Sequence, residues 1–129
     1  MYVTGFSENA QFWNGYYTVK YSASGEPLWQ QRYTFTTPQI NDSYARAIAV
    51  DAEGNVYVTG TMDRGNSTFG TIKYDASGVQ QWLKTYRSGT ELTDAYMLAF
   101  GPDDLLYVGG EHNGEFSDDG FVLVGYSTS

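Results

Sequence analysis

The stretch Tyr57-Val-Thr-Gly60 occurs at three places in the chain and decides the fold. It recurs as Tyr2-Val-Thr-Gly5 and, with one substitution, as Tyr107-Val-Gly-Gly110, at spacings of 55 and 50 residues. Short runs rich in aromatic and β-branched residues that end at a glycine are typical of β-strands. A strand motif that returns at an interval of about 50 residues indicates a protein built from copies of one structural unit.

A second motif repeats in phase with the first. Lys20-Tyr-Ser-Ala-Ser-Gly25 returns 53 residues later as Lys73-Tyr-Asp-Ala-Ser-Gly78. The glycine of each copy stands where a tight hairpin needs a positive φ, and an acidic residue ahead of it can accept hydrogen bonds from the turn backbone. Asp75 of this motif, and Asp51 of the similar turn Asp51-Ala-Glu-Gly-Asn55, are therefore expected to form turns rather than a site.

Each unit is predicted to contain four short strands, A to D. The chain then holds ten strands in the order B-C-D, A-B-C-D, A-B-C. Four-stranded antiparallel sheets repeated along a chain indicate an all-β protein made of β-propeller blades, here about two and a half of them. The predicted ranges are 44–50 and 94–100 for strand A, 2–6, 56–61 and 106–110 for strand B, 15–21, 68–74 and 120–126 for strand C, and 28–35 and 81–87 for strand D.

The whole chain, 1–129, is expected to form a single propeller segment. A partial blade over 1–37 is followed by a full blade over 43–87 and a partial blade over 93–129. Closed propellers typically have four to eight blades, so the ring is expected to close only by oligomerisation or within a longer parent chain. A homo-oligomer is the expected state, with a six-bladed dimer favoured, and the rest of a longer propeller is the alternative partner.

Composition and charge exclude several classes of protein. The absence of cysteine rules out disulfides, thiolate metal sites and a cysteine nucleophile. No apolar run is long enough to span a membrane, and no signal peptide is expected in this chain. The formal net charge of −8 argues against binding nucleic acid through its phosphates, but it permits cations and basic partners.

Two strings of the middle unit resemble a known family. Gly54-Asn-Val-Tyr-Val-Thr-Gly60 and Thr71-Ile-Lys-Tyr-Asp-Ala-Ser-Gly78, followed by Trp82, look like the bacterial β-propeller repeat called SBBP, and the resemblance covers nearly the whole chain. It implies several tandem blades and an extracellular or cell-surface location in a bacterium. It implies no single activity, so no catalytic residue follows from it.

The connections between the predicted strands differ in kind. The A–B and C–D turns are short and alike, whereas the B–C connections (6–14, 61–67, 111–119) and the D–A connections (36–43, 87–93) are long and differ between units. In a propeller these five connections emerge on one face. Because function usually lies on variable loops held by a rigid scaffold, we expect a non-catalytic binding or scaffold module that contacts its ligand or partner through this face.

Several residues of this face could contact a carbohydrate or a protein ligand. Phe12 and Trp13 break the repeat and could stack on a sugar ring, anchor a partner, or pack against a neighbouring unit. Glu111 beside the lone His112 could form half of an acid–base pair, or both could be solvated. The candidate ligand-binding residues are Phe12, Trp13, Asp63, Arg64, Glu91, Glu111 and His112.

Calcium is the one cofactor that the sequence suggests. Four carboxylates within nine residues could supply oxygen ligands, although their spacing matches no Asp-x-Asp-x-Asp-Gly loop, and a solvated acidic loop is the alternative. The candidate metal ligands are Glu111, Glu115, Asp118 and Asp119.

Two further functions stay open. A carbohydrate-active hydrolase or lyase could use channel carboxylates such as Asp63, Glu91 or Asp118 with His112. The chain could also be purely structural spacer blades of a secreted surface protein. The sequence shows no nucleophile–base set, phosphate loop or metal signature, and it therefore favours the binding module over an enzyme.

Overall fold

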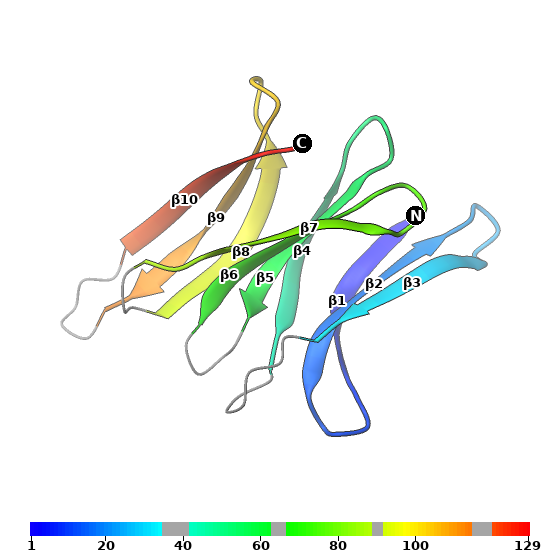
Figure 1. Ribbon diagram of the computed structural model, residues 1–129, viewed down its shortest axis with the longest axis horizontal. Helices are drawn as coiled ribbons and strands as arrows, with labels where there is room; N and C mark the ends of the chain where they lie inside the picture. The colour runs from blue at the N-terminus through cyan, green and yellow to red at the C-terminus, as the bar shows by residue number, and fades with distance from the viewer. Residues whose placement is uncertain (35–41, 63–66, 89–91, 115–119) are drawn as a thin grey trace.

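The computed structural model describes residues 1–34, 42–62, 67–88, 92–114 and 120–129, which form ten antiparallel strands in three sheets (Figure 1). Sheet 1 has the order β1-β2-β3, sheet 2 the order β4-β5-β6-β7 and sheet 3 the order β10-β9-β8. None of the described residues forms a helix that could cross a membrane. The strands are β1 Tyr2–Glu8, β2 Asn14–Tyr21, β3 Pro27–Tyr33, β4 Tyr44–Val50, β5 Val56–Met62, β6 Thr68–Tyr74, β7 Gln80–Tyr86, β8 Leu92–Phe100, β9 Leu105–Asn113 and β10 Gly120–Ser127.

The all-β class and the predicted strand order are confirmed, since the three sheets contain B-C-D, A-B-C-D and A-B-C. The largest difference lies in β9, which continues to Asn113. Glu111 and His112 extend the ladder and pair with Phe121 and Gly120 of β10. The prediction that these two residues lie in a loop is therefore wrong.

The tight turns form as predicted. Asp75 Oδ1 accepts a hydrogen bond of 2.9 Å from the Ser77 backbone N–H, and Asp51 Oδ1 accepts one of 2.8 Å from that of Asn55. A left-handed backbone is costly for residues with a Cβ, which explains why glycine closes these turns. The φ angle lies between 84° and 89° at Gly25, Gly54 and Gly78.

The three sheets stack on one another, with sheet 2 in the middle. All seven residues of β5 are buried, because both of its faces are covered. One cluster lies between sheets 1 and 2, and a second lies between sheets 2 and 3. The first contains Tyr16, Ala45, Val56, Val58, Met62, Ile72 and Tyr74, and the second contains Phe69, Ala95 and Val108 with Leu98, Val122, Val124 and Tyr126 against them.

Each junction joins two different kinds of sheet face. We call front face the one that carries the tyrosine and threonine of the Tyr-Val-Thr-Gly motif, as Tyr57 and Thr59 do in sheet 2. We call back face the opposite one, which carries apolar residues such as Val58 and Ile72. The front of sheet 1 packs on the back of sheet 2, and the front of sheet 2 packs on the back of sheet 3.

A repeated lysine fastens each junction. Lys20 Nζ on the front of sheet 1 donates a hydrogen bond of 2.9 Å to the carbonyl oxygen of Ala76 in the β6–β7 turn. Lys73 Nζ on the front of sheet 2 donates to the carbonyl oxygen of Thr128, which follows β10. Because the two lysines hold matching positions in the repeat, the two junctions have the same geometry.

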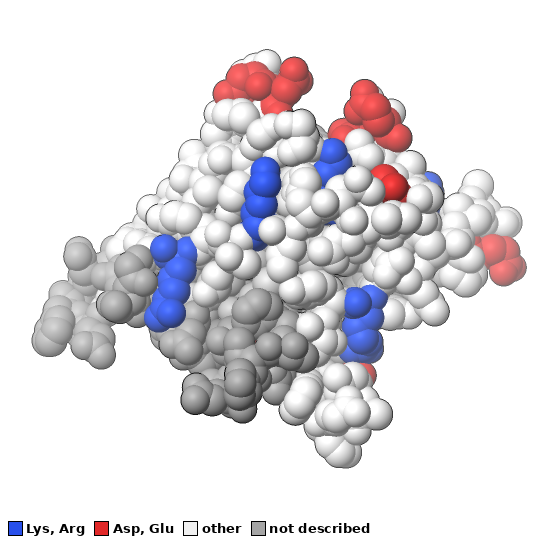
Figure 2. Space-filling model, in the orientation of Figure 1, with Lys and Arg blue, Asp and Glu red and all other residues white. Residues whose placement is uncertain are grey.

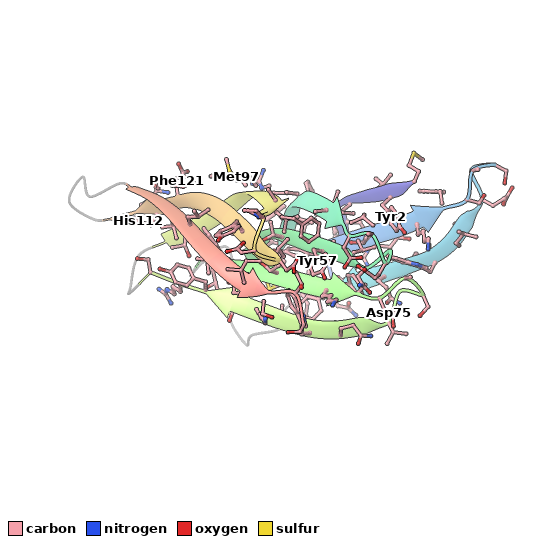
Figure 3. All side chains as sticks on the ribbon, turned by 90° about the horizontal axis from the view of Figure 1, so that it is seen from above. Tyr2, Tyr57, Asp75, Met97, His112 and Phe121 are labelled. Carbon is pink, nitrogen blue, oxygen red and sulfur yellow. The ribbon has the colours of Figure 1, made fainter. Side chains whose placement is uncertain are left out.

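The front face of sheet 3 departs from this pattern. Met97, Phe121 and Leu123 are 54%, 66% and 58% exposed there, and Met97 and Phe121 project from the same side in Figure 3. Gly125 replaces the fastening lysine, and Gly109 replaces a threonine. Within the described ranges, the stack therefore ends on an open apolar face.

Candidate functional site

The strand ends that carry the variable connections lie together. In Figure 1 the ends of β1, β5 and β9 and the starts of β4 and β8 lie along one edge of the molecule, and the tight turns lie along the opposite edge. Figure 2 shows acidic side chains gathered at the tight-turn edge on this side of the molecule. The two edges thus differ in the type of connection that they carry.

A group of six side chains lies toward the variable edge, and we call it the Arg46 cluster. The Arg46 guanidinium carbon is 6.0 Å from the centroid of the Tyr44 ring and 5.9 Å from that of the Tyr96 ring. Both distances are within the range of cation–π attraction. The members are Phe6 of β1, Tyr44 and Arg46 of β4, Asp94 and Tyr96 of β8, and Glu111 of β9.

Matching β-bulges place the two central residues of this cluster. The register of β4 on β5 passes from Ala45 to Ala47, and that of β8 on β9 passes from Ala95 to Met97. The skipped residues are Arg46 and Tyr96. A bulge leaves its extra residue unpaired and changes the direction of that residue's side chain. Arg46 of β4 and Tyr96 of β8 are both exposed.

Hydrogen bonds order the carboxylates of the cluster. The Tyr96 hydroxyl donates a bond of 2.8 Å to Glu111 Oε1, and the Thr61 hydroxyl donates one of 2.6 Å to Asp94 Oδ1. Burial raises the pKa of Tyr96 to about 12, and the bond to Glu111 adds to this rise. The Tyr96 hydroxyl therefore stays protonated at neutral pH and continues to donate.

Phe6 extends the aromatic surface of the cluster. Its ring is 4.8 Å from the Tyr44 ring, centroid to centroid, in an edge-to-face arrangement of 73°. Asn14 Nδ2 lies 3.3 Å from the Tyr44 hydroxyl and donates to it. The cluster thus offers aromatic faces, one guanidinium fork and two carboxylates, a mixture that can stack on a ring and exchange hydrogen bonds with its hydroxyl groups.

Phe12 and Trp13 lie in the turn between β1 and β2. Asn9 Oδ1 accepts hydrogen bonds from the backbone N–H groups of Gln11 and Trp13, and Phe12 has a φ of 64°. The Phe12 side chain is 79% exposed, so it does not pack against a neighbouring sheet within the described part of the chain. Ligand binding by this aromatic pair stays a prediction.

Of the other predicted site residues, Glu111 joins the Arg46 cluster and His112 does not. Neighbouring residues of a strand point to opposite faces, so β9 directs these two side chains apart. His112 is half-buried beside Gly120. The remaining predicted residues lie outside the described residues: Asp63, Arg64, Glu91, Glu115, Asp118 and Asp119.

No acidic or histidine cluster suited to a metal ion occurs in the described ranges. Three of the four carboxylates named for calcium lie outside those ranges. Calcium binding therefore stays a prediction.

A groove of about 530 Å³ opens at the tight-turn edge, between the β4–β5 and β8–β9 turns. Asp51 lines this groove, and its carboxylate accepts hydrogen bonds from Asn55 and from the Tyr57 hydroxyl. This carboxylate is therefore engaged in the structure of the β4–β5 turn. Its lining is Val50, Asp51, Ala52, Glu53, Phe100, Gly101, Asp104 and Thr128.

Part of the chain matches a known repeat family. The family model described as "Beta-propeller repeat", SBBP, matches residues 32–61, which run from the end of β3 through β4 into β5. This segment is therefore similar to an SBBP β-propeller repeat, as the resemblance noted in the sequence implies. Of the three copies of the Tyr-Val-Thr-Gly strand motif, the one at Tyr57–Gly60 lies inside the matched range.

A curated protein is also similar to this chain. It is the regulatory protein FlaEY of Caulobacter vibrioides, which is 29% identical over 108 residues. The match covers 71% of this chain and 11% of the relative, so the chain spans about a tenth of that protein's length.

Proposed function

We propose that the chain is a non-catalytic binding or scaffold module and that the Arg46 cluster is its ligand-contacting surface. The exposed guanidinium of Arg46, placed between the rings of Tyr44 and Tyr96, carries the proposal. Two β-bulges interrupt the regular backbone pairing at Arg46 and Tyr96 and direct these side chains outward. Bulges are common next to functional sites. The similarity to a regulatory protein supports a role in binding rather than in catalysis.

Carbohydrate is the ligand class that fits this surface best. Sugar hydroxyls both donate and accept hydrogen bonds, and the cluster offers donors on Arg46 and acceptors on Asp94 and Glu111. The Phe6 ring, which is more than half exposed, offers a face for stacking on a sugar ring. The net charge of −8 disfavours a polyanionic ligand. A protein segment is the alternative ligand.

Glycan-array binding of the labelled full chain tests the proposal, followed by titration of the selected oligosaccharide. Arg46→Gln and Phe6→Ala should each weaken binding by about tenfold or more, since the loss of one good contact is worth at least about 1.4 kcal/mol. Glu53→Gln, an exposed change at the tight-turn edge, is the control and should bind normally. Binding that all three variants leave unchanged would show that the ligand contacts another surface.

We further propose that the three sheets are blades of a closed ring, completed by a second copy or by the rest of a longer propeller. Each junction inside the chain packs the front of one sheet on the back of the next, and the exposed front of sheet 3 and the back of sheet 1, where Val3 is 47% exposed, are left to pack in the same way. An extracellular or surface location in a bacterium belongs to the same proposal, as the family resemblance implies.

A further inference from the structure

The connection between β1 and β2, the variable connection that the structure describes in full, holds an aromatic residue in a costly backbone conformation. Phe12 has a φ of 64°, which lies in the left-handed region. That region is unfavourable for residues with a Cβ, and glycine, asparagine and aspartate occupy it most readily. Asp104 is the other non-glycine residue with a positive φ in the described ranges, and it belongs to a tolerant type. A bulky aromatic residue in this conformation is therefore an outlier.

The Phe12 side chain gains little packing that could offset this cost. It is 79% exposed, although the following sheet of the chain packs on sheet 1. The free protein thus carries both backbone strain and an apolar ring in water at one residue. Residues held in unfavourable conformations are concentrated at functional sites and ligand contacts. We therefore interpret the Phe12 ring as a contact for a ligand.

Hydrogen bonds fix the turn that presents this ring. Asn9 Oδ1 accepts a bond of 3.0 Å from the Trp13 backbone N–H, and the Asn9 carbonyl oxygen accepts one of 3.0 Å from that of Phe12. At the end of β1, the Arg32 guanidinium donates a bond of 3.3 Å to the carbonyl oxygen of Glu8. A contact surface that is ordered before binding loses less conformational entropy when the ligand binds.

The turn leads directly into the Arg46 cluster. Asn14, the first residue of β2, donates from Nδ2 to Asp42 Oδ1 at 3.1 Å and to the Tyr44 hydroxyl at 3.3 Å. Phe12 lies two residues before Asn14, so their Cα atoms are at most about 7 Å apart. In Figure 1 the β1–β2 connection and the start of β4 lie at the same edge of the molecule. Hydrogen-bonding groups therefore separate the aromatic turn from the aromatic rings of the cluster.

Resting on the proposed function, we infer that the ligand of the Arg46 cluster is an oligosaccharide of several sugar units, and that Phe12 and Trp13 bind a unit remote from Arg46. Each sugar unit has an apolar ring face and a rim of hydroxyl groups. A chain of such units matches a surface on which aromatic rings alternate with hydrogen-bonding groups. A short sugar engages one end of this surface, whereas a long one engages both ends, so affinity should increase with chain length.

Binding of the full chain to immobilised sugars of two lengths tests this inference. The probes are the disaccharides and hexasaccharides of N-acetylglucosamine, glucose and mannose, and the wild-type chain should bind one hexasaccharide about tenfold or more tightly than its disaccharide. Phe12→Ala should weaken binding of that hexasaccharide about tenfold and leave disaccharide binding unchanged, whereas Arg46→Gln should weaken both. Gln11→Ala, an exposed change in the same turn, is the control and should weaken neither.

A second pair of variants separates the backbone cost from the ring. Asparagine tolerates the left-handed region, so Phe12→Asn should raise the melting temperature by roughly 2 °C or more and still lose the preference for the hexasaccharide. Phe12→Trp keeps an aromatic ring and should keep the preference. A lower melting temperature for Phe12→Asn would overturn the inference, by showing that the ring packs within the protein or against a second copy.

The binding results distinguish this inference from the proposed function. Equal affinity for the two lengths, or hexasaccharide binding that Phe12→Ala leaves unchanged, would overturn the inference, while binding that depends on Arg46 would still support the proposed function. Binding that Arg46→Gln leaves unchanged would contradict the proposed site and the inference that rests on it. Absence of binding to every probe would likewise overturn both.

Discussion

Two lysines at matching positions of the repeat contribute to the stability of the junctions between the sheets. Lys20 and Lys73 each reach across a junction to a backbone carbonyl, and each also lies over a tyrosine ring, at 5.5 Å from Tyr2 and 5.4 Å from Tyr57. A hydrogen bond from a charged group contributes about 1.5–3 kcal/mol when it is protected from water, and less when it is partly exposed. The lysine hydrogen bonds thus make a modest contribution to stability at each of the two junctions.

We predict that Lys73→Met lowers the free energy of unfolding by about 1–2 kcal/mol, because it removes both the bond to Thr128 and the cation over Tyr57. Chemical denaturation followed by tryptophan fluorescence measures the loss. Lys73→Arg keeps a charged donor and should lose less. If the arginine variant loses as much free energy of unfolding as the methionine variant, a charged donor at this position is not what stabilises the junction.

A second residue-scale prediction concerns pH. Burial acts to raise the pKa of the Asp51 carboxyl, but hydrogen bonds from Asn55 and Tyr57 outweigh this effect, and the pKa lies below its ordinary value of 3.8. A group whose pKa is lowered by folding stabilises the protein above its unfolded pKa, and this stabilisation is lost as the pH falls through the folded pKa.

Asp51→Asn should therefore cost roughly 1 kcal/mol or less at neutral pH, because the half-buried carboxylate is still partly screened by water. The difference in the free energy of unfolding from wild type should narrow below about pH 4. Urea unfolding across the acidic range measures this. Glu53→Gln in the same turn serves as the comparison. A cost for Asp51→Asn that stays constant into strong acid would contradict the assignment of the effect to the ionised carboxylate.

At the scale of elements, the strands differ in how far their neighbours protect them. β5 is buried along its whole length, whereas β10 alternates between half-buried and exposed residues at the edge of sheet 3. Amide exchange proceeds through local opening, which is rarest where the most contacts must break. We predict that β5 amides exchange most slowly and that β10 amides exchange much faster. Mass spectrometry of peptic fragments measures this, and equal rates would contradict a stack centred on sheet 2.

The same elements show which features of the fold the sequence predicts and which it does not. The ten strands follow from alternation and from the repeat, because each strand is short, bounded by turn residues and present in at least two copies. The sequence does not predict the extension of β9, since Glu111 and His112 are polar residues and continue the strand by pairing with the backbone of β10. The bulges at Arg46 and Tyr96 are hidden too, because a bulge changes the register between two strands and leaves the sequence of one strand unremarkable.

The candidate site was accordingly predicted only in part. The variable connections direct attention to one edge of the molecule, and Glu111 is one of the residues that the sequence names. Arg46, Tyr96 and Phe6 were missed, because the bulges at Arg46 and Tyr96 are hidden in the sequence and the three side chains come together only when the three sheets stack. The available signal was the alignment of Arg46 with Tyr96 in otherwise similar strands, where each of these large residues directly follows an alanine.

At the scale of the whole molecule, the proposed ring closure predicts that the apolar front of sheet 3 is a contact between subunits. If a second copy covers this face, Leu123→Glu should shift the protein to monomer, because a charge buried in an apolar contact is costly. Analytical ultracentrifugation over a range of concentrations measures the shift. Val79→Glu, an exposed apolar residue in the β6–β7 turn, is the control and should change nothing. A wild-type chain that is monomeric at every concentration would contradict closure by a second copy.

The repeated junction has a consequence for how such a protein can change its length. Each 53-residue unit, from Lys20 to Lys73, carries the fastening lysine for the next sheet together with the carbonyl that receives the previous one. Recombination between two copies of the coding segment would therefore add or delete a complete unit and create only joints that already exist. Gly125 stands at the matching position in sheet 3, where a further junction of this kind would also require a lysine in place of the glycine.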